Sequence, residues 1–255
     1  MLTIDETRGE VVVQGADGSR RTLAFDTPEA FEALSAAWLR CGRDVMHVHN
    51  FTWLGRPLIQ LPEDLLRMQE FLWRTQPDVL VQTGVAHGGS LVFYASVLAA
   101  LGHGRVVGVD LDIAANDRAA IEAHPMAPHI ALIEGSSICP RTLAAVRTHI
   151  ACAEQVVIVL DSDHAERRLD AELEAYAPLV PPGGQMVVRD GILANVAGGP
   201  HMDTVRACDG PGGAIDAFLA AHPEFAHEKP GWLSDQRSSR GRMTYWPRCF
   251  LRRVA

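Results

Sequence analysis

Three separate stretches of the chain combine residue types that bind small ligands. The first, residues 82–90 (QTGVAHGGS), lies between an apolar β-branched run and a helical run. Glycine at a strand-to-helix turn lets the backbone turn tightly and approach a ligand, and the N-terminus of the helix favours polar or anionic groups. The turn lacks the GxxxxGK pattern of a phosphate loop, which argues against a nucleoside triphosphatase. His87 within it is either an exposed loop histidine or a functional one.

The second stretch centres on Asp110, which ends the next β-branched run. A carboxylate at the end of the second strand can accept both ribose hydroxyls of an adenosine cofactor. The structural alternative is that Asp110 caps the following helix. Asp112 is a weaker candidate for the same role, and residues 134–137 (EGSS) close the third run, where the adenine ring would lie.

The third stretch, residues 160–164 (LDSDH), places two carboxylates and an imidazole after another apolar run. Asp161 and Asp163 are hard oxygen ligands suited to Mg²⁺, and Asp190 ends the run that follows. His164 is a candidate general base, because the ordinary pKa of histidine lies near working pH. The structural alternative is a set of helix-capping and loop polar groups.

The elements that must position these groups follow a regular rhythm from residue 77 onward. Strand-like runs cover residues 79–83, 106–110, 130–133, 156–161 and 186–188, with two last strands near Phe225 and at 249–254. Helical stretches cover residues 90–101, 116–123, 141–150, 166–177 and about 214–221. This alternation predicts βαβ crossovers, and the continuous apolar strands suit a sheet covered on both faces. We therefore predict an α/β fold with a mostly parallel seven-stranded sheet flanked by helices.

The first 75 residues predict a smaller extension, so that the domains are expected at 1–75 and 76–255. Residues 9–25 read as a β-hairpin, and Thr27 is a good N-cap for a helix that begins with Pro28. A second helix is expected at 62–75. The expected apolar faces of the two helices are Phe31, Leu34, Ala37 and Trp38 in the first, and Leu65, Met68, Leu72 and Trp73 in the second. The extension suggests a cap or an oligomerisation arm, and we expect a homo-oligomer.

Two loop-rich segments, residues 50–57 and 191–213, are expected to frame the substrate. The second reads as a lid on the substrate side of the site. Neither segment indicates which substrate is bound.

The bulk composition excludes several classes of protein. A net charge of −8 argues against nucleic acid and against an anionic membrane surface as partners. The five cysteines include no CxxC pair, which argues against a disulfide framework and a zinc site. No signal peptide and no run long enough to span a bilayer is visible, so we expect a cytoplasmic enzyme with a small-molecule substrate.

Taken in order, the motifs resemble one known family. They are residues 50–57 (NFTWLGRP), 83–90 (TGVAHGGS), 109–112 (VDLD), 134–137 (EGSS), 160–164 (LDSDH) and 176–180 (YAPLV). Together they resemble the cephalosporin hydroxylase family, a branch of the class I methyltransferases. Its relatives include Mg²⁺-dependent O-methyltransferases of macrolide deoxysugars and rhamnosyl O-methyltransferases. The resemblance implies a Rossmann-like class I methyltransferase fold and S-adenosylmethionine as the cofactor.

The resemblance also implies roles for individual residues. The cofactor would be bound by Gln82, Thr83, Gly84, His87, Gly88, Ser90, Asp110, Leu111, Gly135, Ser136, Ser137 and Asp161. The catalytic residues would be His164, Asp161 and Arg189, and Mg²⁺, if present, would be bound by Asp161, Asp190 and Asp163. The expected reaction is methylation of a hydroxyl group on a sugar or another secondary metabolite, with His164 accepting the proton.

Two positions depart from the family pattern. Gln82 stands where the first strand often ends in Glu, and Arg189 stands where many relatives have a metal-binding acid. An arginine cannot ligate Mg²⁺, so either Asp163 or water completes the metal site, or the metal is weak or absent. Arg189 could instead neutralise an anionic group of the substrate. Two alternatives therefore stand beside the methyltransferase: a hydroxylase-type oxidoreductase, and a methyltransferase-like accessory protein without turnover.

Overall fold

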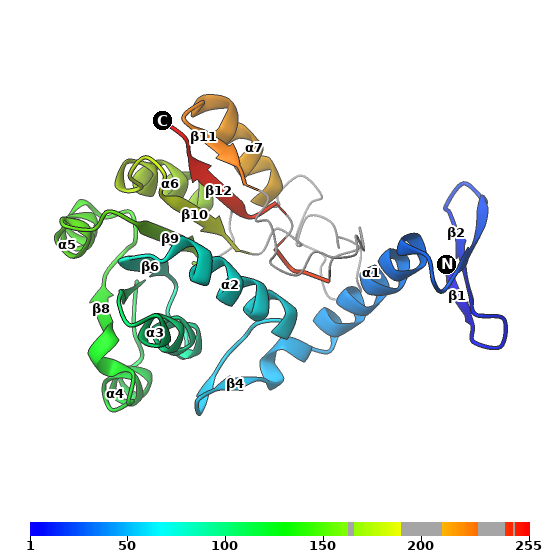
Figure 1. The fold of residues 1–255 in the computed structure, drawn as a ribbon, viewed down its shortest axis with the longest axis horizontal. Coiled ribbons are helices and arrows are strands. Elements are labelled where there is room, and N and C mark those ends of the chain that lie inside the picture. The colour runs from blue at the N-terminus through cyan, green and yellow to red at the C-terminus, as the bar shows by residue number, and fades with distance from the viewer. Residues whose placement is uncertain (163–165, 190–210, 229–242, 247) are drawn as a thin grey trace.

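A seven-stranded sheet forms the centre of the molecule (Figure 1). The computed structural model describes residues 1–162, 166–189, 211–228, 243–246 and 248–255. The strand order is β11-β12-β10-β9-β6-β7-β8. The strands are β6 (Val79–Thr83), β7 (Arg105–Asp110), β8 (Ile130–Glu134), β9 (Val156–Leu160), β10 (Gln185–Val188), β11 (Phe225–His227) and β12 (Phe250–Arg253). The mostly parallel seven-stranded sheet is therefore confirmed.

The pairing of the central strands determines where a ligand can bind. Strand β6 pairs in parallel with β7 on one side and with β9 on the other. The chain thus builds the sheet outward from β6 in one direction and then starts again beside it in the other. Such a reversal of strand order opens a crevice at the carboxyl ends of the two strands, and open α/β sheets bind ligands there. Strand β12 is antiparallel to both of its neighbours, β10 and β11, whereas the other described pairs of this sheet are parallel.

Helices cover both faces of the sheet (Figure 1). One face packs against α2 (Pro62–Thr75), α3 (Gly89–Leu101) and α4 (Ala115–Glu122), and the other against α5 (Pro140–Ile150), α6 (Glu166–Tyr176) and α7 (Pro211–Ala221). Because both faces are covered, all five residues of β6 and of β9 are buried.

Helix α2 packs in the same core as the sheet, although it lies in the first 75 residues. Its Met68, Phe71 and Leu72 are fully buried there. Burying side chains of this size stabilises the fold by about 1.5–3 kcal/mol each. The opposite face of α2 is exposed, and Trp73, which we expected on the apolar face, is 53% exposed. The division into domains 1–75 and 76–255 stays a prediction.

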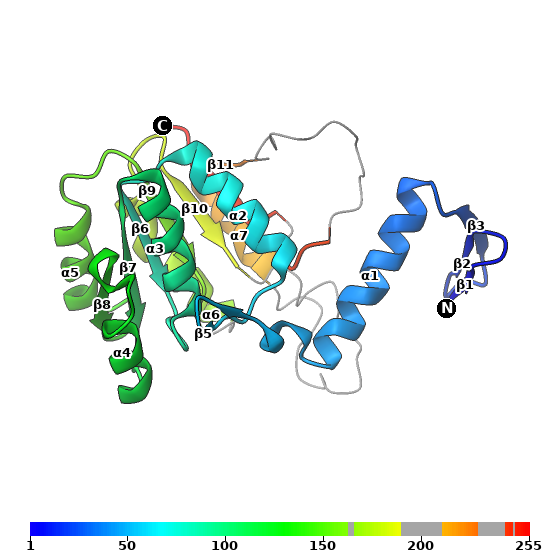
Figure 2. The same cartoon turned by 60° about the horizontal axis from the view of Figure 1, so that its bottom comes forward.

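Residues 1–44 form an arm that extends away from the sheet (Figure 2). It contains β1 (Leu2–Asp5), β2 (Glu10–Gln14), β3 (Arg20–Ala24) and α1 (Pro28–Asp44). The predicted hairpin is β2 and β3, but β1 adds a third antiparallel strand that the prediction missed. The Oγ1 atom of Thr27 accepts a hydrogen bond from the Ala30 N–H at 3.2 Å, as expected of an N-cap.

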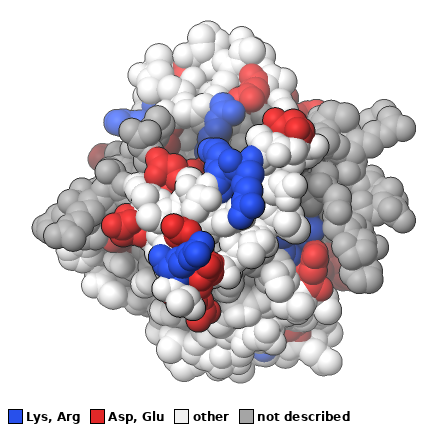
Figure 3. Space-filling view, turned by 90° about the vertical axis from the view of Figure 1, so that its right-hand side faces the viewer, with Lys and Arg blue, Asp and Glu red and all other residues white. Residues whose placement is uncertain are grey.

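The buried face of α1 differs from the predicted one. Ala30 and Leu39 are buried, whereas Phe31 and Trp38 are 41% and 39% exposed. Figure 3 views the molecule from the side of the arm, where arginines form a short band flanked by acidic side chains. The charge on this face is therefore mixed.

The segments between the arm and the sheet are short. A 3₁₀ turn at His47–Asn50 leads into β4 (Thr52–Trp53) and β5 (Arg56–Pro57), which pair with each other. Two further 3₁₀ turns lie at Ala127–His129 and Ala177–Leu179.

The expected lid at 191–213 is only partly described. Residues 191–210 lie outside the described residues, whereas 211–213 belong to α7, so the loop prediction was wrong there. Proline suits the first turn of a helix, which explains why α7 begins at Pro211 and not near residue 214. Among the described residues, none of the helices has the length and apolar character needed to cross a bilayer.

Candidate functional site

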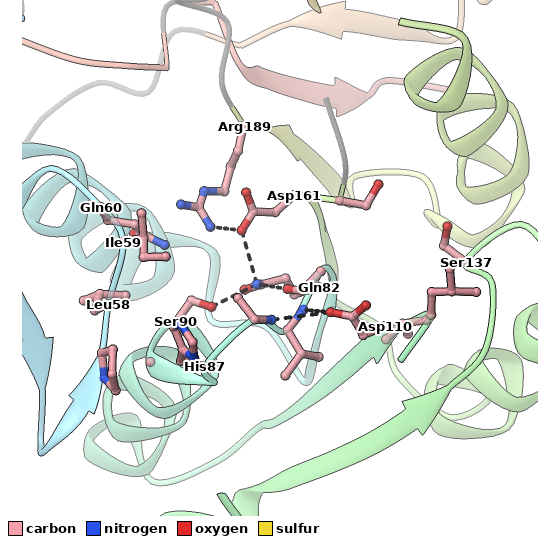
Figure 4. Close-up of a pocket in the computed structure, with 18 of the residues that line it drawn as sticks. Leu58, Ile59, Gln60, Gln82, His87, Ser90, Asp110, Ser137, Asp161 and Arg189 are labelled. Carbon is pink, nitrogen blue, oxygen red and sulfur yellow. Dashed lines mark hydrogen bonds and ion pairs between the residues drawn. The ribbon is translucent and has the colours of Figure 1, made fainter. Parts of the chain in front are cut away.

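A cavity of about 530 Å³ opens at the carboxyl ends of β6, β7 and β9 (Figure 4). Nine of the predicted site residues line it: Gln82, Gly84, His87, Ser90, Asp110, Leu111, Ser137, Asp161 and Arg189. Residues from all three sequence stretches therefore meet in one place. Four predicted residues do not line it, namely Thr83, Gly88, Gly135 and Ser136.

Glycines allow the turn after β6 to pack closely against its neighbours. Gly84 has a φ of +80°, and a Cβ atom there would come within 3.0 Å of the Asp161 carbonyl oxygen. At Gly89, a Cβ atom would come equally close to the Pro57 carbonyl oxygen. The turn thus joins the ends of β6 and β9 and draws the segment after β5 onto the N-terminus of α3, which only glycine permits.

Asp110 holds this turn in place. Its Oδ2 accepts hydrogen bonds from the N–H groups of Val85 at 2.7 Å and Ala86 at 3.4 Å. Helix α4 has Ala114 at its N-cap and no side-chain cap, so Asp110 does not cap it. The carboxylate is half-buried and lines the cavity, which leaves Oδ1 available to a ligand.

The floor of the cavity is a polar network around Gln82, which is 1% exposed (Figure 4). Its Nε2 donates to the carbonyl oxygen of Gly84 at 2.5 Å, to Ser90 Oγ at 2.9 Å and to Asp161 Oδ2 at 3.3 Å. Its Oε1 is buried without a hydrogen-bond partner among the described residues. A buried acceptor without a partner is costly, so this atom suits a donor group on a ligand.

Asp161 also forms an ion pair with Arg189, and Figure 4 shows the two side chains pointing toward each other. Arg189 is only 7% exposed. With the Gln60 amide oriented so that its oxygen faces Arg189, Oε1 accepts from both Nη1 and Nη2 at 2.8 Å. The guanidinium also lies 4.9 Å from the ring centroid of Trp246.

Behind Arg189 lies a second buried carboxyl group, Asp64 of α2, which is 1% exposed. It accepts hydrogen bonds from Thr244 Oγ1 and from the Tyr245 N–H. Burial raises the pKa of Asp64 to about 6, although these hydrogen bonds and the nearby arginines oppose the increase.

Behind the floor, Thr83 supports Asp161 through its hydroxyl group. Thr83 Oγ1 accepts from the Asp161 N–H at 3.2 Å and donates to the buried Glu172 Oε2 at 3.3 Å. Thr83, predicted to bind the cofactor, therefore contacts a cavity-lining residue and does not line the cavity itself.

A clamp at the mouth of the cavity was not predicted. Arg56 donates to the carbonyl oxygen of His87 and, through Nη2, to Asp117 Oδ1 at 2.7 Å. His87 Nδ1 lies 3.2 Å from Asp117 Oδ2. Burial opposes ionisation of Asp117, but the hydrogen bonds from Arg56 and His87 outweigh it and lower the pKa of its carboxyl group. This clamp fastens the β4–β5 segment over the glycine turn.

The predicted Mg²⁺ site is described only at Asp161. Asp163, Asp190 and the expected base His164 lie outside the described residues. The carboxylate of Asp161 is already engaged by Gln82 and Arg189. The described residues contain no group of three or more His, Cys, Asp or Glu side chains that could hold a metal ion. By itself, the described part of the site does not fit Mg²⁺.

The sequence analysis missed three contributors to the cavity wall: Leu58, Ile59 and Gln60. They follow the quoted motif 50–57, and their apolar-rich pattern carries no chemical signal. The packing of this segment against Gly89 and the contacts of Arg56 bring it to the cavity.

The chain is also similar to known proteins. Residues 45–254 match the family model described as Rhamnosyl O-methyltransferase/CmcI. A rhamnosyl O-methyltransferase of Mycobacterium leprae is 29% identical over 180 residues, which cover 69% of this chain and 74% of that protein.

Two solved structures of CmcI share the fold. One, with SAH, has a TM-score of 0.55 and 20% identity, and the match covers 80% of this chain and 83% of that one. The other, with Mg and SAM, has a TM-score of 0.51 and 19% identity, and the match covers 81% of this chain and 78% of that one.

Proposed function

The chain belongs to the rhamnosyl O-methyltransferase/CmcI family, which makes it an S-adenosylmethionine-dependent O-methyltransferase, and we propose that its acceptor is a hydroxyl group of a sugar. The match to the family model confirms the resemblance that the sequence motifs indicated. The name of the Mycobacterium leprae relative supports a rhamnosyl acceptor.

The observation that carries the proposal is the convergence of the glycine turn, Asp110 and Asp161 on one cavity at the reversal of strand order. Asp110 would bind the ribose hydroxyls through Oδ1. The methionine end would lie along the glycine turn. Its ammonium group could there donate a hydrogen bond to Gln82 Oε1, which has no partner among the described residues. S-adenosylmethionine, when bound, supplies a methyl group activated by its sulfonium.

The protein then has two tasks: to align the acceptor oxygen with the methyl group and to remove the hydroxyl proton. We assign proton removal to His164, which follows β9 by four residues. The clamp of Arg56, His87 and Asp117 would keep the segment after β5 against the cofactor and exclude water. No step is assigned to a metal ion, because the described part of the site does not fit one.

Transfer of a ¹³C-labelled methyl group tests the proposal. We expect mass spectrometry to detect a labelled product with rhamnosides or other sugars. His164→Ala should reduce the rate at least about 100-fold, as expected for a general base. The matched control is His103→Ala, since His103 is an exposed histidine that contacts Gln76. If S-adenosylhomocysteine binds but no hydroxylated compound is methylated, the proposal is refuted and the chain is a methyltransferase-like accessory protein without turnover.

We also propose that the N-terminal arm joins copies of the chain. The arm leaves Phe25, Phe31 and Trp38 about 40% exposed, and an interface between copies of the chain would bury these aromatic side chains. Light scattering should give a multiple of the 27.7 kDa chain, and replacing Phe31 and Trp38 by serine should reduce the mass. A wild-type monomer would contradict this assignment.

A further inference from the structure

Resting on the proposed function, we propose that the guanidinium of Arg189 is the fixed cation of this site and that methyl transfer here needs no divalent metal.

The sheet register forces Arg189 and Asp161 together. Strands β9 and β10 are parallel, with Val188 beside Leu160, and the Arg189 N–H donates to the Leu160 carbonyl oxygen at 3.0 Å. The residues that follow these two, Arg189 and Asp161, therefore lie at the same edge of the sheet. Both side chains line the cavity, and the Asp161 carboxylate, which would have to bind a metal, is instead paired with Arg189.

The surroundings of Arg189 hold its guanidinium beside Asp161. Its side chain is 6% exposed, with Gln60 and the ring of Trp246 against the guanidinium in addition to Asp161. A divalent cation at Asp161 would either lie beside this buried positive charge or expel it from its partners. Both are unfavourable, because like charges repel strongly where water is scarce, and a buried charge without partners is costly.

The guanidinium can provide the electrostatic part of a metal's role. It stays protonated at any working pH and has only N–H donors. As the acceptor hydroxyl gives its proton to the base, its oxygen forms a bond to the methyl carbon, and the bond from that carbon to sulfur breaks with its electron pair going to sulfur. Arg189 exchanges no proton in this step. It stabilises the negative charge that develops on the acceptor oxygen, as preorganised cations do in other enzymes.

Metal binding can be measured independently of any substrate. Manganese(II), which replaces magnesium at oxygen-ligand sites, is titrated into the S-adenosylhomocysteine complex and followed by electron paramagnetic resonance. We expect no stoichiometric site with a Kd below about 1 mM. One such site that disappears in Asp161→Asn would overturn the inference.

Activity gives the second readout. We expect the enzyme, after dialysis against a chelator, to keep its rate within twofold and to gain nothing from added Mg²⁺. Arg189→Gln should reduce kcat about 100-fold with S-adenosylhomocysteine affinity changed by less than threefold, and Arg189→Lys should recover part of the rate. Arg248→Gln, at an exposed arginine paired with Asp216, is the matched control and should behave as wild type.

The outcomes separate this inference from the proposed function. Methyl transfer that stops with the chelator and returns with Mg²⁺ refutes the inference but leaves the methyltransferase intact. Failure to bind S-adenosylhomocysteine refutes both. If Arg189→Gln does not fold, the manganese titration and the chelator experiment on the wild-type protein still decide the question.

Discussion

Replacing Asp110 by alanine should separate cofactor binding from folding. Oδ2 of Asp110 is engaged by the N–H groups of Val85 and Ala86, so the ribose hydroxyls depend mainly on Oδ1. A hydrogen bond to a charged group contributes about 1.5–3 kcal/mol. Losing the ribose contacts and the fixed turn together should cost about 3 kcal/mol, which weakens S-adenosylhomocysteine binding roughly 100-fold.

Calorimetric titration of S-adenosylhomocysteine measures this effect, and two further variants set its scale. Asp110→Asn keeps an acceptor for the turn but loses the charge, so its affinity should fall by roughly 10-fold. The matched control is Asp112→Ala, because Asp112 is an exposed acidic residue of the same cavity. Its affinity should stay within about threefold of wild type, because the N–H groups of the turn bind Asp110 and not Asp112.

Denaturant unfolding shows whether Asp110→Ala is folded. Two amides of the turn lose their acceptor, and we expect a loss of about 1–2 kcal/mol in the free energy of unfolding. A folded Asp110→Ala protein that binds S-adenosylhomocysteine within threefold of wild type would refute the assignment. Loss of binding in Asp112→Ala would move the role to that residue.

Three further predictions concern the surroundings of the cavity. Burial raises the pKa of Asp64 to about 6 in the folded protein, against an ordinary value of 3.8. The contribution of this carboxyl group to the free energy of unfolding is therefore present below pH 4 and is lost as the pH rises through 6. Over this range the free energy of unfolding should fall by on the order of 3 kcal/mol. Asp64→Asn should remove this pH dependence between pH 4 and 7, and an unchanged pH profile would refute the prediction. Gly89→Ala should destabilise the fold by about 1–3 kcal/mol, because its Cβ would meet the Pro57 carbonyl oxygen. The control Gly42→Ala, in a helix with room for a Cβ, should stabilise the fold slightly, and thermal unfolding measures both variants. Arg56→Ala should open the clamp and weaken S-adenosylhomocysteine binding severalfold, as measured by calorimetry. An unchanged affinity would show that the clamp does not contribute to cofactor binding.

Much of the fold was predictable because its signals are local. The β-branched runs ending at Thr83, Asp110 and Asp161 are short, mostly apolar and separated by helical stretches, which favours a parallel sheet. Parallel strands place their carboxyl ends at one edge, so the meeting of the three polar stretches followed from topology. The third strand of the arm was missed because Leu2–Asp5 is short and lies at the very start of the chain.

The parts that sequence reasoning missed depend on contacts between distant residues. Phe31 and Trp38 have the spacing of a buried helix face, but the arm extends away from the sheet and leaves them exposed. The contact of Gln60 with Arg189 joins residues far apart in the chain, and no pattern near Gln60 indicates it. Arg189 was recognisable as unusual, whereas its ion pair with Asp161 becomes evident only from the register of β9 and β10.

A crystal structure with S-adenosylhomocysteine would show whether the cofactor binds in this cavity. We expect both ribose hydroxyls within hydrogen-bond distance of Asp110, the amino-acid end along the turn of Gly84 and beside Gln82, and the sulfur facing the Asp161–Arg189 pair. Density for the ligand elsewhere, or a ribose bound without Asp110, would contradict this arrangement.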